Sequence, residues 1–79
     1  MRLDKYLKVS RLIKRRTVAN EACDAGKVTV NGKPARASYD VKVGDVIALT
    51  LGAREVSVEV VAVQETVAKN DASTLYKIV

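Results

Sequence analysis

The sequence predicts an α+β domain, in which two short N-terminal helices with a basic connector pack on a small, mostly antiparallel sheet of four to five strands. Two observations support this prediction. Apolar residues recur at helical spacing up to Gly26, and beyond it they alternate with a period of two between turn residues. A chain of 79 residues has enough apolar side chains for one small core. We therefore expect residues 1–79 to form a single domain.

The first helix is predicted over residues 2–9, where Leu3, Tyr6 and Leu7 share one face. Asp4 lies in its first turn, where a carboxylate either caps the helix or holds an arginine side chain in position. Because Tyr6 is in phase with the two leucines, we expect it in the core and not as a stacking platform for a nucleic-acid base.

The second helix is predicted from Thr17 to Ala25. Residues 10–16 contain only two apolar side chains and form the basic connector that precedes it. Thr17 is the predicted N-cap, and Asn20-Glu21 complete a loose capping box. Gly26 supplies the matching stop signal, because a glycine tolerates the left-handed conformation that ends many helices.

A hairpin is predicted immediately after the second helix. Val28 and Val30 alternate with polar residues and lead into Asn31-Gly32, the strongest short hairpin signal. Pro34 lacks a backbone N–H, so it confines the returning strand to an edge of the sheet.

The C-terminal half is predicted to hold the remaining strands. Two longer strands cover residues 46–51 and 54–63 and are joined by a tight turn at Gly52-Ala53. The alternation slips at Val60-Val61, which predicts a bulge. After a polar loop, residues 74–79 form the last strand.

The charge is divided unequally along the chain. Residues 1–42 contain eleven Lys and Arg against four Asp and Glu, a net charge of +7. Residues 43–79 contain three against five, a net charge of −2. Such asymmetry indicates a polyanionic partner for the N-terminal half, and nucleic acid is the common case. The alternative is a basic surface that serves only solubility.

Several function classes are disfavoured by composition. The chain has no His and a single cysteine, Cys23, so we expect no metal site, no internal disulfide and no cofactor. No acid–base pair or activated nucleophile is recognisable, which argues against an enzyme. No apolar run has the length of a membrane span and no signal peptide is present, so we expect a cytoplasmic protein without membrane contact.

The basic connector is the first candidate binding site. Residues 11–16 precede the predicted helix, whose free N–H groups and partial positive charge attract anions. Arginines in this stretch can contact two phosphate oxygens at once. Arg2 and Lys5, three residues apart, project from one side of the first helix toward the same ligand.

The predicted hairpin is the second candidate binding site. Lys27, Lys33 and Arg36 flank its turn, so the hairpin can lie along an RNA backbone. If it abuts the second helix, it extends the same binding surface. The same cations on a merely exposed edge strand would serve to discourage aggregation, and the residues alone do not separate these two hypotheses.

A family resemblance follows from the order of these motifs. They are Arg2-Leu3-Asp4-Lys5-Tyr6-Leu7, Ser10-Arg11, Lys14-Arg15-Arg16-Thr17, Ala22, Gly26, Val28-Thr29-Val30-Asn31-Gly32 and Val43-Gly44-Asp45. Over residues 1–51 the chain resembles the small RNA-binding domain named for the fourth small-subunit ribosomal protein. Among its stand-alone forms, the chain is similar to a short bacterial ribosome-quality-control family related to the heat-shock ribosome-binding proteins.

The resemblance implies a function and a set of site residues. It implies binding to a large ribosomal subunit that still holds peptidyl-tRNA, with contacts to large-subunit rRNA and to the tRNA. It also implies cooperation with the NEMF-type tailing factor, which adds C-terminal alanine to stalled chains. Together with the charge pattern, it gives the candidate RNA-binding residues Arg2, Asp4, Lys5, Lys8, Arg11, Lys14, Arg15, Arg16, Thr17, Lys27, Lys33 and Arg36.

Two alternative functions stay open at this point. One is a protein-interaction adaptor that docks a partner on acidic strands bearing Glu55, Glu59 and Glu65. The other is a general rRNA-binding or ribosome-assembly factor. An RNA-modifying enzyme without its catalytic domain would show no activity alone.

Overall fold

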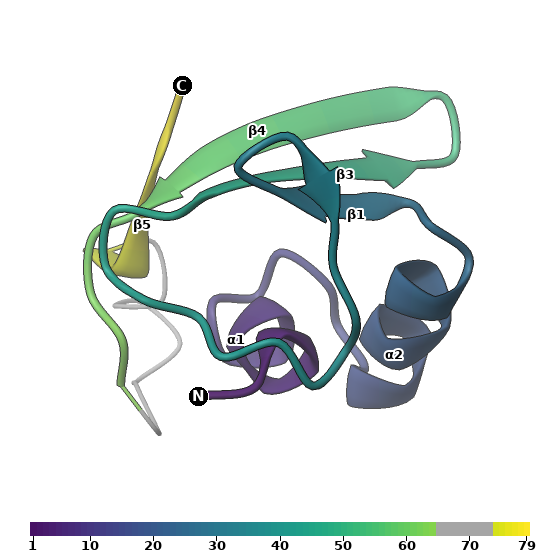
Figure 1. The fold of residues 1–79 in the computed structure, drawn as a ribbon, viewed down its shortest axis with the longest axis horizontal. Helices are drawn as coiled ribbons and strands as arrows, with labels where there is room; N and C mark the ends of the chain where they lie inside the picture. The colour runs from purple at the N-terminus through teal and green to yellow at the C-terminus, as the bar shows by residue number, and fades with distance from the viewer. Residues whose placement is uncertain (65–73) are drawn as a thin grey trace.

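The computed structural model describes residues 1–64 and 74–79 and confirms the predicted α+β fold (Figure 1). Its elements are α1 (Leu3–Val9), α2 (Arg16–Asp24), β1 (Val28–Val30), β2 (Lys33–Pro34), β3 (Val46–Leu51), β4 (Arg54–Val60) and β5 (Tyr76–Ile78). The strands pair antiparallel in the order β2-β1-β3-β4-β5. Both helices lie on the same side of this sheet (Figure 1).

The hydrophobic core lies between the helices and the sheet face that they cover. Its side chains are Leu3, Tyr6, Leu7, Ile13, Ala19, Cys23, Val28, Val30, Ala37, Val41, Ile47, Leu49, Val58, Val60 and Leu75. Full burial of one such aliphatic side chain stabilises the fold by about 1.5–3 kcal/mol. Because α1 turns one apolar face to this core, its basic residues project away from it.

Tyr6 is fully buried, which confirms its predicted place in the core. Its hydroxyl donates a hydrogen bond of 2.7 Å to the carbonyl of Leu75, and so ties α1 to the segment before β5. Burial, with a smaller contribution from Tyr76, raises the pKa of the Tyr6 hydroxyl to about 12. The ring is therefore unavailable for stacking on a nucleic-acid base.

Tyr6→Phe is expected to lower the free energy of unfolding by about 0.5–1.5 kcal/mol, because the hydrogen bond from the Tyr6 hydroxyl to the Leu75 carbonyl is lost. That carbonyl keeps the backbone N–H groups of Val61 and Ala62 as donors, so it is not left unpaired. Urea unfolding of both proteins measures this difference, and RNA affinity is expected to stay unchanged. An unfolding midpoint equal to that of the wild type would show that this hydrogen bond does not stabilise the fold.

The first turn of α1 is held by the backbone of a distant loop. The Leu3 N–H donates to the carbonyl of Tyr39 at 2.8 Å, and the Asp4 N–H donates to that of Ala37 at 3.1 Å. The N-terminal ammonium group also forms an ion pair of 2.7 Å with Asp40. These contacts satisfy amides that a helix start leaves unpaired and fix the orientation of α1.

The start of α2 differs from the prediction. The helix begins at Arg16, and Arg15 is its N-cap, with an extended backbone (φ −122°, ψ 136°) and no capping side chain. The predicted N-cap role of Thr17 and the capping box are therefore wrong. The reason is tertiary, because Thr17 already lies inside the helix and Asn20 donates to Asp4 on the neighbouring helix.

The turns around β1 form as predicted. Gly26 ends α2 in the left-handed conformation (φ 74°), and the Lys27 N–H reaches back to the carbonyl of Ala22 at 2.9 Å. Asn31-Gly32 also takes positive φ at both positions (54° and 84°), as a type I′ hairpin turn requires. Pro34 lies in β2, an edge strand of the sheet.

The last strand forms as predicted, and the bulge lies at a different position from the predicted one. β4 ends three residues earlier than predicted. The N–H groups of Val61 and Ala62 then both donate to the carbonyl of Leu75, at 2.8 and 3.1 Å. Two consecutive residues that face one residue of the partner segment form a bulge. It lies at Val61-Ala62, one residue later than predicted. The predicted polar loop lies outside the described residues from residue 65 on.

Candidate nucleic-acid interface

A buried carboxylate joins the two helices. Asp4 in the first turn of α1 is 2% exposed. Its oxygens lie 3.2 Å from Nε of Arg2 and 3.4 Å from Nε of Arg16. They also accept hydrogen bonds from Nδ2 of Asn20 (3.3 Å) and from the backbone N–H of Lys5 (2.8 Å). The alternative in which Asp4 holds arginine side chains is therefore confirmed. The N-cap of α1 is Arg2, so Asp4 is not the cap, although it accepts from one first-turn N–H.

The surroundings of Asp4 keep it charged. Burial by itself would raise its pKa, but hydrogen bonds from Arg2, Asn20, the Lys5 N–H and Arg16 outweigh this effect. Together they hold the pKa of the carboxyl below its ordinary value of 3.8. At neutral pH the carboxylate thus binds the guanidinium groups of Arg2, the residue before α1, and of Arg16 in α2.

Arg2 and Arg16 are the cations that this carboxylate positions. Their side chains are 50% and 47% exposed, so each is anchored at Asp4 and still accessible from outside. Arg16 approaches Asp4 through Nε, and its guanidinium group has five N–H donors in all, more than one carboxylate oxygen can accept. A shallow hollow borders this cluster, and Thr17 and Glu21 contribute to its lining.

The connector and the exposed side of α1 carry further cations. Lys5 is half-buried, whereas Lys8, Arg11, Lys14 and Arg15 are exposed. They follow one another along the chain from α1 to the start of α2, where Arg16 joins the Asp4 cluster. Of the predicted helical part of the site, the structure thus brings Arg2 and Arg16 together, and the other cations are distributed along α1 and the connector.

Arg11 adopts a backbone conformation that side chains disfavour. Its φ is 62°, and its N–H donates to the carbonyl of Lys8 at 3.0 Å just after α1 ends. Glycine is usual at such a position, because a side chain in the left-handed region costs roughly 1–2 kcal/mol. An arginine that persists at this cost is consistent with a role for its guanidinium group in binding.

Arg11→Gly is expected to separate stability from binding. The free energy of unfolding should stay equal or rise by up to about 1 kcal/mol, because the left-handed strain disappears. RNA affinity should fall several-fold as one phosphate contact is lost. Thermal unfolding and fluorescence anisotropy measure the two effects. Loss of stability without loss of affinity would contradict a binding role for Arg11.

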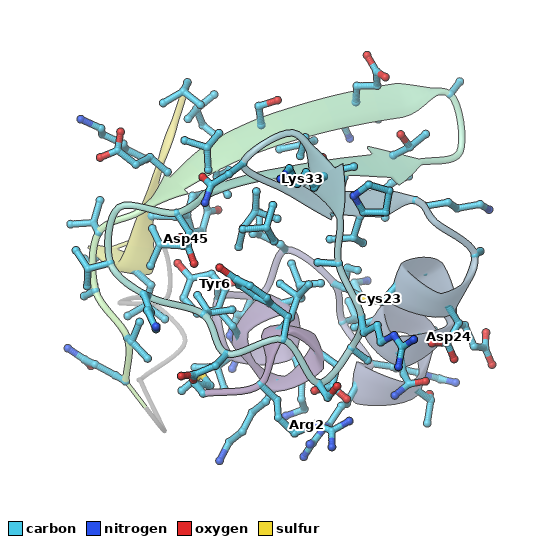
Figure 2. The ribbon with its side chains drawn as sticks, viewed as in Figure 1. Arg2, Tyr6, Cys23, Asp24, Lys33 and Asp45 are labelled. Atoms are coloured by element: carbon cyan, nitrogen blue, oxygen red, sulfur yellow. The ribbon has the colours of Figure 1, made fainter. Side chains whose placement is uncertain are left out.

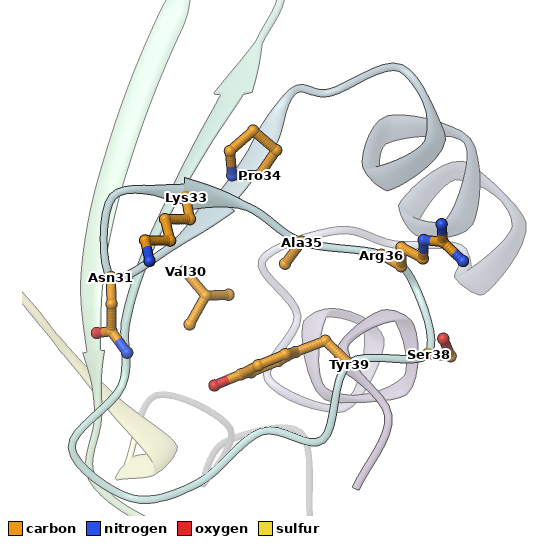
Figure 3. Close-up of a pocket in the computed structure, with 8 residues that line it drawn as sticks. All are labelled: Val30, Asn31, Lys33, Pro34, Ala35, Arg36, Ser38 and Tyr39. Atoms are coloured by element: carbon orange, nitrogen blue, oxygen red, sulfur yellow. The ribbon is translucent and has the colours of Figure 1, made fainter.

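The hairpin residues are only partly brought to this surface. Lys27 follows the C-terminal end of α2, roughly 13 Å along the nine-residue helix from Arg16. Lys33 on β2 lies on the sheet side, well away from Arg2 (Figure 2). Arg36 extends toward α2 (Figure 3). Lys27 and Lys33 therefore lie apart from the Asp4 cluster, and Arg36 lies between the hairpin and the helices.

Three residues of this region escaped prediction. Asn20 donates to Asp4, and its only sequence signal is its spacing of four residues from Arg16 on the same helix face. Tyr39 donates its hydroxyl to Asp45 at 3.0 Å. Tyr39 lies in a segment without periodicity, and Asp45 was assigned only to a turn, so no local pattern indicated the contact.

Two of the three acidic residues of the adaptor alternative, Glu55 and Glu59, lie on β4. Glu55 is exposed, and Glu59 is half-buried and forms an ion pair of 3.9 Å with Lys77 of β5. Glu65 lies outside the described residues. Part of the acidic charge is thus neutralised within the sheet.

Cys23 is buried at the interior face of α2. Burial, followed by the charges of Asp4 and Asp24, raises the pKa of its thiol to about 11, so the thiol stays protonated at neutral pH. Among residues 1–64 and 74–79, no three His, Cys, Asp or Glu side chains gather around a point that a metal ion would occupy. Over the same ranges, neither helix has the length and apolar character needed to cross a membrane.

Comparison with known proteins identifies the family. Residues 1–47 match the S4 domain. The chain is 56% identical to the RQC P-site tRNA stabilizing factor of Halalkalibacterium halodurans and 50% identical to that of Bacillus subtilis. Each alignment covers 99% of this chain, and they cover 89% and 91% of those proteins. The chain belongs to this S4-domain family. The predicted resemblance is confirmed.

Solved structures of S4-domain relatives share the fold. Heat shock protein 15 of Vibrio cholerae, described as trimeric, superposes with a TM-score of 0.94 at 31% identity, covering 100% of this chain and 81% of its own. The solution structure of the hypothetical protein HP1423 gives a TM-score of 0.82 at 32% identity, covering 99% and 95%. The helices and sheet described above are therefore those of the family.

Proposed function

We propose that this protein binds structured RNA through the surface formed by α1, the connector and the first turn of α2. The observation that carries the proposal is the Asp4 cluster, in which one buried carboxylate holds both Arg2, just before α1, and Arg16 of α2. Arginines fixed at a defined separation suit the phosphates of a folded RNA. Duplex RNA is recognised mainly by shape, phosphate and 2′-OH contacts, which suits a small rigid face whose nearby tyrosine, Tyr6, is buried.

On the ribosome, this surface would contact large-subunit rRNA and the peptidyl-tRNA of an obstructed large subunit. This role is supported by the name of the relatives, RQC P-site tRNA stabilizing factor. We further propose that the protein acts as a binding factor without catalysis, in the cytoplasm, and assists a NEMF-type factor in C-terminal alanine tailing. Fixing the tRNA in place is a task that a rigid basic surface can perform alone.

The test is co-sedimentation of the purified protein with three particles: empty large subunits, large subunits carrying peptidyl-tRNA, and intact ribosomes. Each is measured at low and at raised salt, because phosphate contacts weaken steeply as salt rises. We expect preferential binding to the large subunit with peptidyl-tRNA. Arg16→Ala should abolish this preference, whereas Arg54→Ala, an exposed charge at the start of β4, should retain it.

Two other outcomes would favour the alternatives. Equal, salt-sensitive binding to all three particles would indicate a general rRNA-binding or assembly factor. Absence of binding to any particle would contradict the RNA proposal and favour the adaptor, whose test is charge reversal of Glu55 and Glu59.

A further inference from the structure

A second basic feature lies beside the hairpin, apart from the Asp4 cluster. A hollow of about 660 Å³ opens at the surface between β2 and the segment that follows it (Figure 3). Figure 3 shows the Tyr39 ring edge-on along one side of this hollow, with Lys33, Pro34 and Ala35 along the other. Val30 also lines the hollow and lies between the ring and Lys33 in this view, so a planar group that enters would meet the Tyr39 ring beside the Val30 side chain.

The walls of the hollow are held by a second buried carboxylate, Asp45, which is 9% exposed. It accepts hydrogen bonds from the Tyr39 hydroxyl (3.0 Å), from Nδ2 of Asn31 (3.1 Å) and from the Lys42 N–H (3.0 Å). Asn31 in turn accepts from the Val46 N–H at 3.0 Å. The aromatic ring and the hairpin turn are thus fixed relative to each other before any ligand binds, which lowers the entropy lost on binding.

The charge on the rim of the hollow is positive. Lys33 and Arg36 line it and are exposed, and neither side chain forms an ion pair with another of the described residues. Ser38 adds a hydroxyl to the lining. A ligand with one flat ring and flanking negative charges would match these groups, whereas a hydrocarbon would leave the cations unpaired.

We propose that this hollow binds one unpaired nucleotide of an RNA strand, with its base against Tyr39 and its flanking phosphates at Lys33 and Arg36. The volume is that of a small-molecule site, which suits a single nucleotide. Base–aromatic stacking tolerates any base and adds substantial affinity for single strands. The inference rests on the proposed function, since it gives the RNA-binding protein a second contact, to an unpaired nucleotide next to a duplex.

The experiment compares two RNAs that share one hairpin stem, one blunt-ended and one with a three-nucleotide single-stranded overhang. The overhang carries 5-iodouridine, which crosslinks on irradiation to an aromatic ring stacked on it. We expect the wild-type protein to bind the overhang RNA roughly tenfold more tightly than the blunt RNA. Mass spectrometry should locate the crosslink at Tyr39.

Matched variants separate stacking from folding. Tyr39→Leu, and the double change Lys33→Ala with Arg36→Ala, should each bring the ratio of the two affinities close to one while blunt RNA still binds. Tyr39→Phe keeps the ring, loses only the hydrogen bond to Asp45, and should retain most of the ratio. Thermal unfolding confirms that each variant is folded.

The failure of this inference is distinguishable from failure of the proposed function. Equal wild-type affinity for the two RNAs, or a crosslink that maps to the helices, would overturn the nucleotide site and leave duplex binding intact. The double change Arg2→Ala with Arg16→Ala should lower the affinity for both RNAs and preserve the ratio of the two affinities. Tight binding of free uridine monophosphate without any overhang effect would overturn the RNA-strand ligand in favour of a free nucleotide.

Discussion

Replacement of both Arg2 and Arg16 by alanine is expected to lower the affinity for structured RNA by about 100-fold. Each guanidinium group is oriented by Asp4 but half-exposed, so each change removes a charge-assisted contact worth roughly 1.5 kcal/mol, the low end of the usual range. The slope of the logarithm of affinity against the logarithm of salt should become shallower by roughly one for each lost phosphate contact. Fluorescence anisotropy over a salt series measures both quantities.

The control for this double variant removes charge from another surface. Arg54 lies at the start of β4, and Arg54→Ala is expected to leave the RNA affinity and its salt dependence nearly unchanged. If the Arg2 and Arg16 changes lowered affinity no more than Arg54→Ala, net charge and not a defined surface would account for RNA binding.

Asp4→Asn is expected to lower the free energy of unfolding by about 2 kcal/mol and also to weaken RNA binding. The amide keeps the shape but loses the charge that four donors share, and the partial exposure of Arg2 and Arg16 limits the loss. The change raises the net charge by one, which by itself would strengthen binding to phosphates. Loss of arginine positioning should outweigh this effect and lower the affinity several-fold.

Asp24→Asn is the matched control, because Asp24 is an exposed carboxylate at the end of α2 (Figure 2). It adds the same charge without touching the cluster, so affinity should stay equal or rise slightly. Urea unfolding and anisotropy are measured on both variants. Tighter RNA binding by Asp4→Asn would mean that Asp4 only repels phosphate and does not position the arginines.

Features set by neighbouring residues were predictable. The stop at Gly26 and the turn at Asn31-Gly32 depend on the backbone freedom of residues within the turn itself, and both occur as predicted. The buried position of Tyr6 followed from helical spacing, which local geometry also sets.

The predicted start of α2 failed for the opposite reason. Thr17 and Asn20 have side chains suited to capping, but Asn20 donates to Asp4 on another helix. A competing partner sixteen residues away is invisible to a local pattern. The Asp4 cluster itself was only half predicted, since the sequence suggested an arginine partner without indicating that Arg2 and Arg16 would share the carboxylate.

The sequence by itself determined the order of the elements, the aliphatic core and the concentration of positive charge in residues 1–42, because periodicity, turn residues and charge are local properties. Only the tertiary structure decided which of those cations act together. Packing of α1 against α2 brings Arg2 and Arg16 to Asp4, and the return of the chain after β2 places Tyr39 opposite Lys33. These arrangements depend on contacts between segments that are distant in the sequence, and the spacing of neighbouring residues does not encode such contacts.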